Sequence, residues 1–227
     1  MGVLFITGTV AGILSVVFSG SILGAPDYLA KVSANQNQVI IGALFELILG
    51  AANVGIAVMI FPIFKKHNEP IALGYVGARI IEGVGYVVGV ISLLSLLTLS
   101  QEFVKAGAPD ASYFQALGTL LLAVREWTGV VGVDIVFGLG ALMFYYLWYQ
   151  SKLIPRFISV WGLIGATLYL AYGLLGMLGH SPFSTIPLLL QLPLAVNEMF
   201  LAVWLIVKGF NPSAIASGSA KIDANKV

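Results

Sequence analysis

Five acidic side chains lie within or at the edge of long apolar stretches, where an unpaired charge is costly. The acids are Glu46, Glu82, Glu126, Asp134 and Glu198, and two cations accompany them, Arg79 and Arg125. Because the acids outnumber the bases, some of the carboxyl groups must be protonated or compensated by a bound cation. Acids in such positions take up protons or ions in transporters. The residue types therefore predict a site for a proton, an ion or a small solute.

Helical spacing places several of these groups on faces shared with other polar residues. Glu46 and Asn53 lie on one stripe together with glycines that permit close contact between helices. Arg79 and Glu82 are three residues apart, so their side chains can form an ion pair within one helix. Tyr86 follows on the same face. We expect both stripes to face protein rather than lipid.

The remaining polar groups fall on three later helices. Asp134 shares a face with Gly138 and Tyr145, and Tyr172 belongs to an aromatic stripe that carries no charge. Gln191 and Glu198 are seven residues apart and therefore share a face. Two prolines, at positions 187 and 193, are expected to bend that helix.

Depth along the helices divides these residues into a polar centre and an outer approach. The centre is predicted to contain Asn53, Arg79, Glu82, Gln191 and Glu198. The outer approach is predicted to contain Glu46, Arg125 and Asp134. Tyr86 and Tyr172 complete the set of candidate residues for binding a ligand, a proton or an ion.

A purely structural alternative remains open for the same residues. Arg79 with Glu82 and Arg125 with Glu126 could be internal ion pairs. Neutral carboxyl groups could then act as hydrogen-bonding contacts between helices. These would be Glu46, Asp134 and Glu198.

The composition excludes a water-soluble monomer. Of 227 residues, 59% are hydrophobic and 9% are charged, whereas soluble domains carry about 25% charged residues. The mean hydropathy of +0.99 agrees with a lipid environment. A net charge of +1 without a basic cluster excludes nucleic-acid binding. The absence of cysteine excludes disulfides and thiol chemistry.

Uncharged stretches long enough to cross a bilayer, about 20 residues each, predict an all-α bundle of about six transmembrane helices. They lie near 1–23, 39–64, 72–99, 128–149, 159–178 and 186–207. Residues 112–127 are apolar but end in Arg125 and Glu126. We interpret them as an extra interfacial or re-entrant helix, or as a long outer extension of the fourth span. One transmembrane domain over 1–210 and a disordered cytoplasmic tail over 211–227 are predicted.

Lysine and arginine in the loops predict the orientation in a cell membrane, because they concentrate on the cytoplasmic side. Seven of them follow the second, fourth and sixth spans, whereas only Lys31 and Lys105 fall on the opposite side. Both termini are therefore expected to be cytoplasmic. The first span is interpreted as a membrane helix rather than a signal peptide, because its apolar run is long and no basic residue precedes it.

The sequence lacks the residue patterns that several well-known membrane functions require. His67 and His180 fall in loops on opposite sides, which excludes a bis-histidine haem within the bundle, and no lysine lies in mid-span to hold retinal. Asp134 alone cannot form an intramembrane aspartyl dyad. We therefore predict no catalytic residue, metal site or cofactor, and an enzyme is disfavoured.

Two segments carry a family resemblance. They are Ala43-Leu-Phe-Glu-Leu-Ile with the following Val54-Gly-Ile-Ala-Val, and Ala72-Leu-Gly-Tyr-Val-Gly-Ala-Arg-Ile-Ile-Glu-Gly. With Phe61-Pro-Ile-Phe-Lys-Lys-His-Asn-Glu between them, the chain resembles a prokaryotic membrane-protein family catalogued as domain-of-unknown-function family 4386. The resemblance covers nearly the whole chain. It implies a polytopic bundle and no particular activity.

Three functions follow as hypotheses. The first is a protein that binds or transports a small solute or ion, in contact with lipid and with a small-molecule or lipid ligand. The second is a membrane scaffold or accessory subunit, for which glycine stripes should be buried against a partner or a second copy of the chain. The third is a lipid-modifying intramembrane enzyme, which requires an opening wide enough for an acyl chain beside the polar centre.

Overall fold

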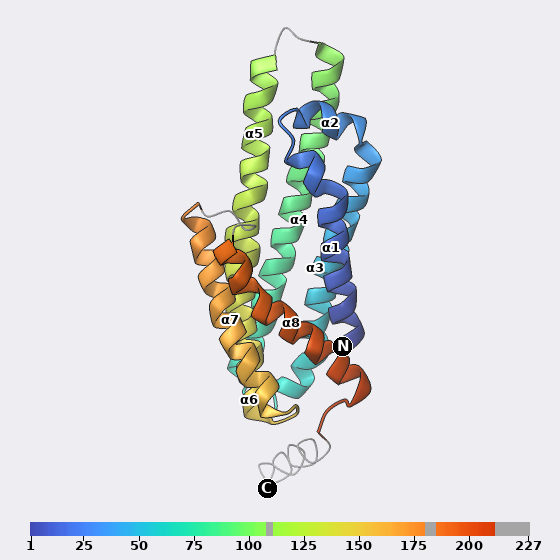
Figure 1. The fold of residues 1–227 in the computed structure, drawn as a ribbon. Helices are drawn as coiled ribbons and strands as arrows, with labels where there is room; N and C mark the ends of the chain where they lie inside the picture. The colour runs from blue at the N-terminus through green and yellow to red at the C-terminus, as the bar shows by residue number, and fades with distance from the viewer. Residues whose placement is uncertain (108–110, 180–184, 212–227) are drawn as a thin grey trace.

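The structure is a computed structural model that describes residues 1–107, 111–179 and 185–211. Every regular element in these ranges is a helix (Figure 1). In chain order they are α1 (Gly2–Leu23), α2 (Tyr28–Ala34), α3 (Gln36–Phe64), α4 (Glu69–Ala106), α5 (Ala111–Trp127), the π-helix η2 (Thr128–Ile135), α6 (Val136–Ser151), α7 (Arg156–Met177) and α8 (Thr185–Val207).

Six of the helical runs in the described residues are long and apolar enough to cross a membrane. Each covers one of the six predicted stretches, although the third run ends later than predicted, at Ala106, and the fourth begins earlier, at Ser112. This confirms the all-α membrane bundle. The predicted tail begins at Asn211, whose backbone amide donates a hydrogen bond of 2.8 Å to the carbonyl oxygen of Leu153. The rest of that tail, 212–227, and the loop residue His180 lie outside the described residues.

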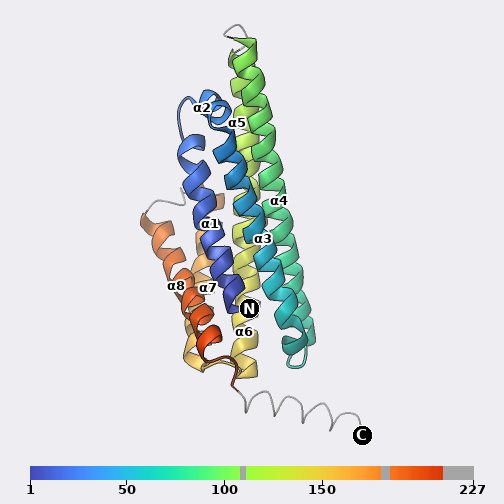
Figure 2. The ribbon, with the colours of Figure 1, turned by 90° about the vertical axis from the view of Figure 1, so that its right-hand side faces the viewer.

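The six spans close into a ring. Helix α1 packs on α3, α3 on α4, and α4 on the continuous run of α5, η2 and α6. That run packs on α7, α7 packs on α8, and α8 returns to α1. Figures 1 and 2 show the spans side by side around this ring, with α8 tilted across it. Each helix therefore has one face toward lipid and one toward a shared interior.

Residues 112–127 are the outer extension of the fourth span and not a re-entrant helix. Ser112–Ser151 forms one helical run of 40 residues, beside an α4 of 38 residues. Both exceed the length needed to cross a bilayer, so α4 and α5 rise together beyond the other spans (Figures 1 and 2). Their contact stabilises the extension, because Ser92 donates a hydrogen bond of 2.6 Å to the carbonyl oxygen of Leu121.

The short helix α2 was not anticipated from the sequence. It buries Leu29 and Val32 against the extension of α4, and the Tyr28 hydroxyl donates a hydrogen bond of 3.4 Å to the carbonyl oxygen of Gln115. Lys31 bonds the exposed Asp27 at 3.0 Å, and this hydrogen bond lowers the pKa of Asp27. Helix α2 thus covers the junction between α1 and α3.

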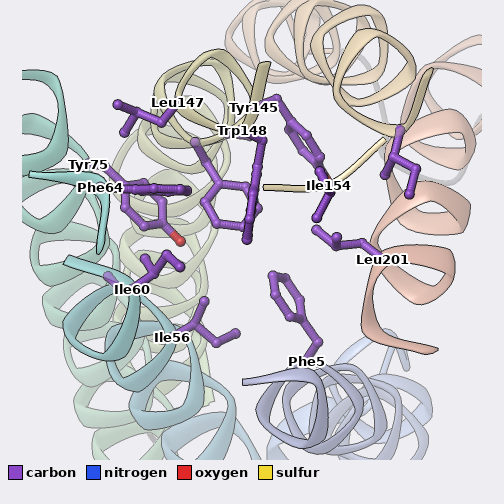
Figure 3. Packing of buried hydrophobic residues seen from close by; sticks show 14 of the residues in the cluster. Phe5, Ile56, Ile60, Phe64, Tyr75, Tyr145, Leu147, Trp148, Ile154 and Leu201 are labelled. Atoms are coloured by element: carbon purple, nitrogen blue, oxygen red, sulfur yellow. The ribbon is translucent and has the colours of Figure 1, made fainter. Parts of the chain in front are cut away.

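Bulky side chains fill the ring at the end that carries the α3–α4 and α6–α7 connections (Figure 3). Phe64 and Phe144 both stack edge-on against Trp148, with ring centroids 5.0 and 5.6 Å apart. Phe5 of α1 and Leu201 of α8 reach the same cluster from the opposite side of the ring. We call this set of residues the aromatic plug. It closes one end of the interior.

Close packing of α6 on α7 depends on Gly162. A Cβ atom added at Gly162 would overlap the ring of Tyr145, which is fully buried beside Phe144. The ring therefore has no room to move away, and the helices must separate instead.

We expect Gly162→Val to lower the free energy of unfolding by about 1–3 kcal/mol, because overpacking a tight contact costs this much. The measurement is reversible unfolding in mixed detergent micelles. Gly77→Val is the matched control, because a Cβ atom at Gly77 meets nothing within 4 Å. Equal losses in the two variants would contradict the packing described here.

Candidate functional site

The polar centre is built on a fully buried ion pair. The Arg79 guanidinium donates to the Glu82 carboxylate at 2.8 Å, and neither side chain is more than 1% exposed. Both lie on α4 three residues apart, as the sequence predicts. Asn53 of α3 donates a second hydrogen bond of 2.8 Å to Glu82, and Arg79 also donates to the Tyr75 hydroxyl at 3.3 Å. The predicted grouping of Asn53, Arg79 and Glu82 is therefore present.

Aromatic rings and one more acid complete the surroundings of Arg79. Its guanidinium carbon lies 4.7 Å from the centroid of the Phe137 ring and 5.5 Å from that of Tyr75. Such stacking favours a desolvated cation. Glu198 of α8 is near enough to act electrostatically on Arg79. Within the described part of the chain, however, Glu198 has no hydrogen bond or ion pair.

A second ion pair lies further toward the α4–α5 end and joins two helices. Arg125 of α5 bonds both carboxylate oxygens of Glu46 on α3, at 2.6 and 3.3 Å, and the carbonyl oxygen of Gly89 at 2.9 Å. The alternative pair of Arg125 with Glu126 is therefore wrong. The carboxylate that Arg125 bonds belongs to Glu46 on another helix, and the neighbouring Glu126 is exposed.

Asp134 bonds to the neighbouring helix α7, and no cationic side chain of the described residues forms an ion pair with it. Its two carboxylate oxygens accept hydrogen bonds from the hydroxyls of Tyr169 and Tyr172, at 2.8 and 3.2 Å. Asp134 lies in the π-helix η2, a rare geometry that occurs frequently at functional sites. The predicted face is confirmed despite the π turn, because Gly138 and Tyr145 also contact α7.

Two cavities lie within the ring on the open side of the aromatic plug. The outer cavity has a volume of about 670 Å³ and is lined by Glu46, Tyr86, Arg125, Glu126, Asp134, Tyr172 and Gln191, among others. The inner cavity, of about 190 Å³, is lined by Asn53, Tyr86, Tyr169, Gln191 and Glu198, among others. Tyr86 and Gln191 line both cavities and therefore mark the boundary between them.

All ten predicted residues belong to these cavities or to the Arg79 network. Sequence reasoning missed Tyr75, Phe137 and Tyr169, which bond or stack against the predicted groups. Tyr169 carried a usable signal, because it lies three residues before Tyr172 on the same stripe. The π-helix left no signal in the sequence that periodicity alone can detect.

The charges on the wall of the outer cavity are unbalanced. Glu46, Glu126 and Asp134 face Arg125, whose guanidinium is already bonded to Glu46. Among the described residues no group of three or more acidic, histidine or cysteine side chains is arranged to hold a metal ion. The arrangement is suited to a small polar or cationic solute, because the volume lies in the usual range of ligand sites.

The fold and these cavities define a multi-pass helical membrane protein with a polar interior. The chain belongs to the family described as Domain of unknown function (DUF4386), whose model matches residues 1–209. This confirms the resemblance noted in the sequence. No curated protein and no solved structure matches the chain.

The bond between α3 and α5 can be tested with a double-mutant cycle on Glu46→Gln and Arg125→Gln. We expect a coupling of about 1–2 kcal/mol in the free energy of unfolding, because each single change leaves its partner unpaired at a largely buried position. The exposed pair of Glu102 and Lys105 is the control and should couple by less than about 0.5 kcal/mol. A coupling no larger than that of the control would refute a structural role for the pair.

Proposed function

We propose that the ring binds a small solute or ion in its two cavities and carries it toward the aromatic plug. One observation carries this proposal: the outer cavity and an inner cavity beside the buried network share Tyr86 and Gln191 as wall residues, while bulky side chains close the other end. A structural bundle needs no such interior space, because helices that only support one another pack without voids.

The buried network suggests a division of roles. Arg79 and Asn53 occupy the carboxylate of Glu82 and hold it in one orientation. Glu198 faces the inner cavity without a bonded partner among the described residues, so it is the group that takes up a proton or a cation. Gln191 supplies hydrogen bonds at the boundary between the cavities.

Carrying a solute across requires the aromatic plug to open. Two polar atoms in or beside the plug support the idea that its side chains can adopt a second, open arrangement. They are the Tyr145 hydroxyl and the Trp148 indole nitrogen, which are buried without a hydrogen-bond partner in the described residues. A buried polar group in this condition costs free energy, which hydration in an open state would recover. The plug therefore has a physical reason to rearrange.

The scaffold alternative receives less support. Its discriminating feature is glycine stripes buried against a partner, but the stripes are used within the chain. Gly8 contacts Asn53 on α3, Gly85 contacts Gly132 in η2, and Gly89 contacts Glu46 on α3. The glycines therefore bring helices of one ring together.

Native mass spectrometry of protein extracted in mild detergent tests the binding proposal without assuming a ligand. We expect a discrete added mass on the wild-type chain that is lost in Glu198→Gln, because the variant removes the acid that faces the inner cavity. Glu102→Gln is the matched control, because its carboxylate is 57% exposed and lies outside both cavities. Bare protein in all three, each with native helix content, would argue against a bound solute.

A further inference from the structure

We propose that the solute carries an ammonium group and that Asp134 binds this group. This inference rests on the proposed function and names the chemical class of the ligand. The site is the inner part of the outer cavity, where Asp134 lies between Tyr172, which lines the outer cavity, and Tyr169, which lines the inner one.

The distribution of charge favours a cation over an anion. Arg125, the cationic side chain on the described wall of the outer cavity, donates to both Glu46 oxygens and to the Gly89 carbonyl oxygen. Three of its five N–H groups are occupied in this way, and its charge is balanced by that of Glu46. Asp134 and Glu126 add two formal negative charges, and neither is ion-paired within the described ranges. An anion would therefore be repelled, and a cation would be attracted.

Asp134 has capacity for one more donor. An ionised carboxylate offers about four lone-pair directions, and the two tyrosine hydroxyls occupy two of them. Both tyrosines donate, so they also fix the plane of the carboxylate. An ammonium group could add its own hydrogen bonds without displacing either tyrosine.

The rest of the wall fits an organic cation better than a metal ion. The rings of Tyr86 and Tyr172 lie on the wall, and aromatic faces attract ammonium groups. Val130, Val133 and Leu188 supply apolar surface for the body of a ligand. A hard metal ion would need about six oxygen ligands, whereas Glu46 is committed to Arg125 and Asp134 is flanked by neutral hydroxyls.

Probes that share an apolar body and differ in the charge of the polar end group test this proposal on the wild-type protein. One set is phenethylamine, phenethyl alcohol and hydrocinnamate, and the other is hexylamine, hexanol and hexanoate. We expect the two amines to raise the midpoint of thermal unfolding in detergent at about pH 7, where amines are protonated. The matched alcohols and carboxylates should raise it less or not at all. If neither amine binds more tightly than its alcohol, the proposal is wrong.

The variant Asp134→Asn then tests whether the amines bind at Asp134. The variant keeps the shape of the side chain and removes its charge, so we expect the affinity for the amines to fall at least about tenfold. Asp27→Asn is the matched control, because Asp27 is exposed at the N-terminal end of α2 and lines neither cavity. Unchanged amine affinity in a folded Asp134→Asn variant would overturn the assignment.

The two proposals fail in distinguishable ways. A co-purified mass that is lost in Glu198→Gln, together with no preference for amines, would refute the ammonium class and leave the binding function standing. Bare protein together with no response to any of the six probes would refute both. Amine binding that is lost in Asp134→Asn supports both.

Discussion

The cost of charge in hydrocarbon is the constraint on which the rest of the structure depends. Arg79 and Glu82 cannot face lipid, so α4 must turn this face inward, and the neighbouring helices must close around it. The pair neutralises itself within one helix, but a carboxylate has further lone pairs to satisfy. Asn53 from α3 meets that need, and the stacked Phe137 shields the guanidinium. The ring thus encloses the charge pair and supplies the partners that it needs.

Side-chain size divides the enclosed space into a closed end and an open end. Trp148, Phe64 and Phe144 fill the interior beside the basic loops. Toward the other end, glycines replace bulky residues on the wall of the outer cavity. They are Gly85, Gly89, Gly129, Gly176 and Gly179. These glycines keep the wall free of bulky side chains, and the cavity is polar because Asp134, Arg125 and Glu46 also line it.

The sequence was sufficient to predict the features that depend on a single helix. Apolar length located all six spans, and a spacing of three located the bond between Arg79 and Glu82. Contacts between helices were harder to predict, because periodicity shows which residues share a face of one helix but not which other helix that face meets. Depth placed Arg125 with Glu46 in the outer approach but did not show that the two bond, and it did not show that Tyr169 meets Asp134. Helix α2 was missed for a related reason, since its buried residues pack against α4, a distant part of the chain.

Asp134 and Glu198 share one charged neighbour, and under the proposed function this neighbour gives their two sites a means of coupling. Glu82 acts electrostatically on Asp134, and also on Glu198. An ammonium group bound at Asp134 would lower the cost of negative charge on the inner acids, and so favour release of a proton from Glu198. By thermodynamic linkage, a proton bound at Glu198 would weaken binding of the cation by the same factor. A cation and a proton that exclude each other in this way are what an exchange of one for the other requires, and the boundary at Tyr86 and Gln191 keeps their two sites distinct.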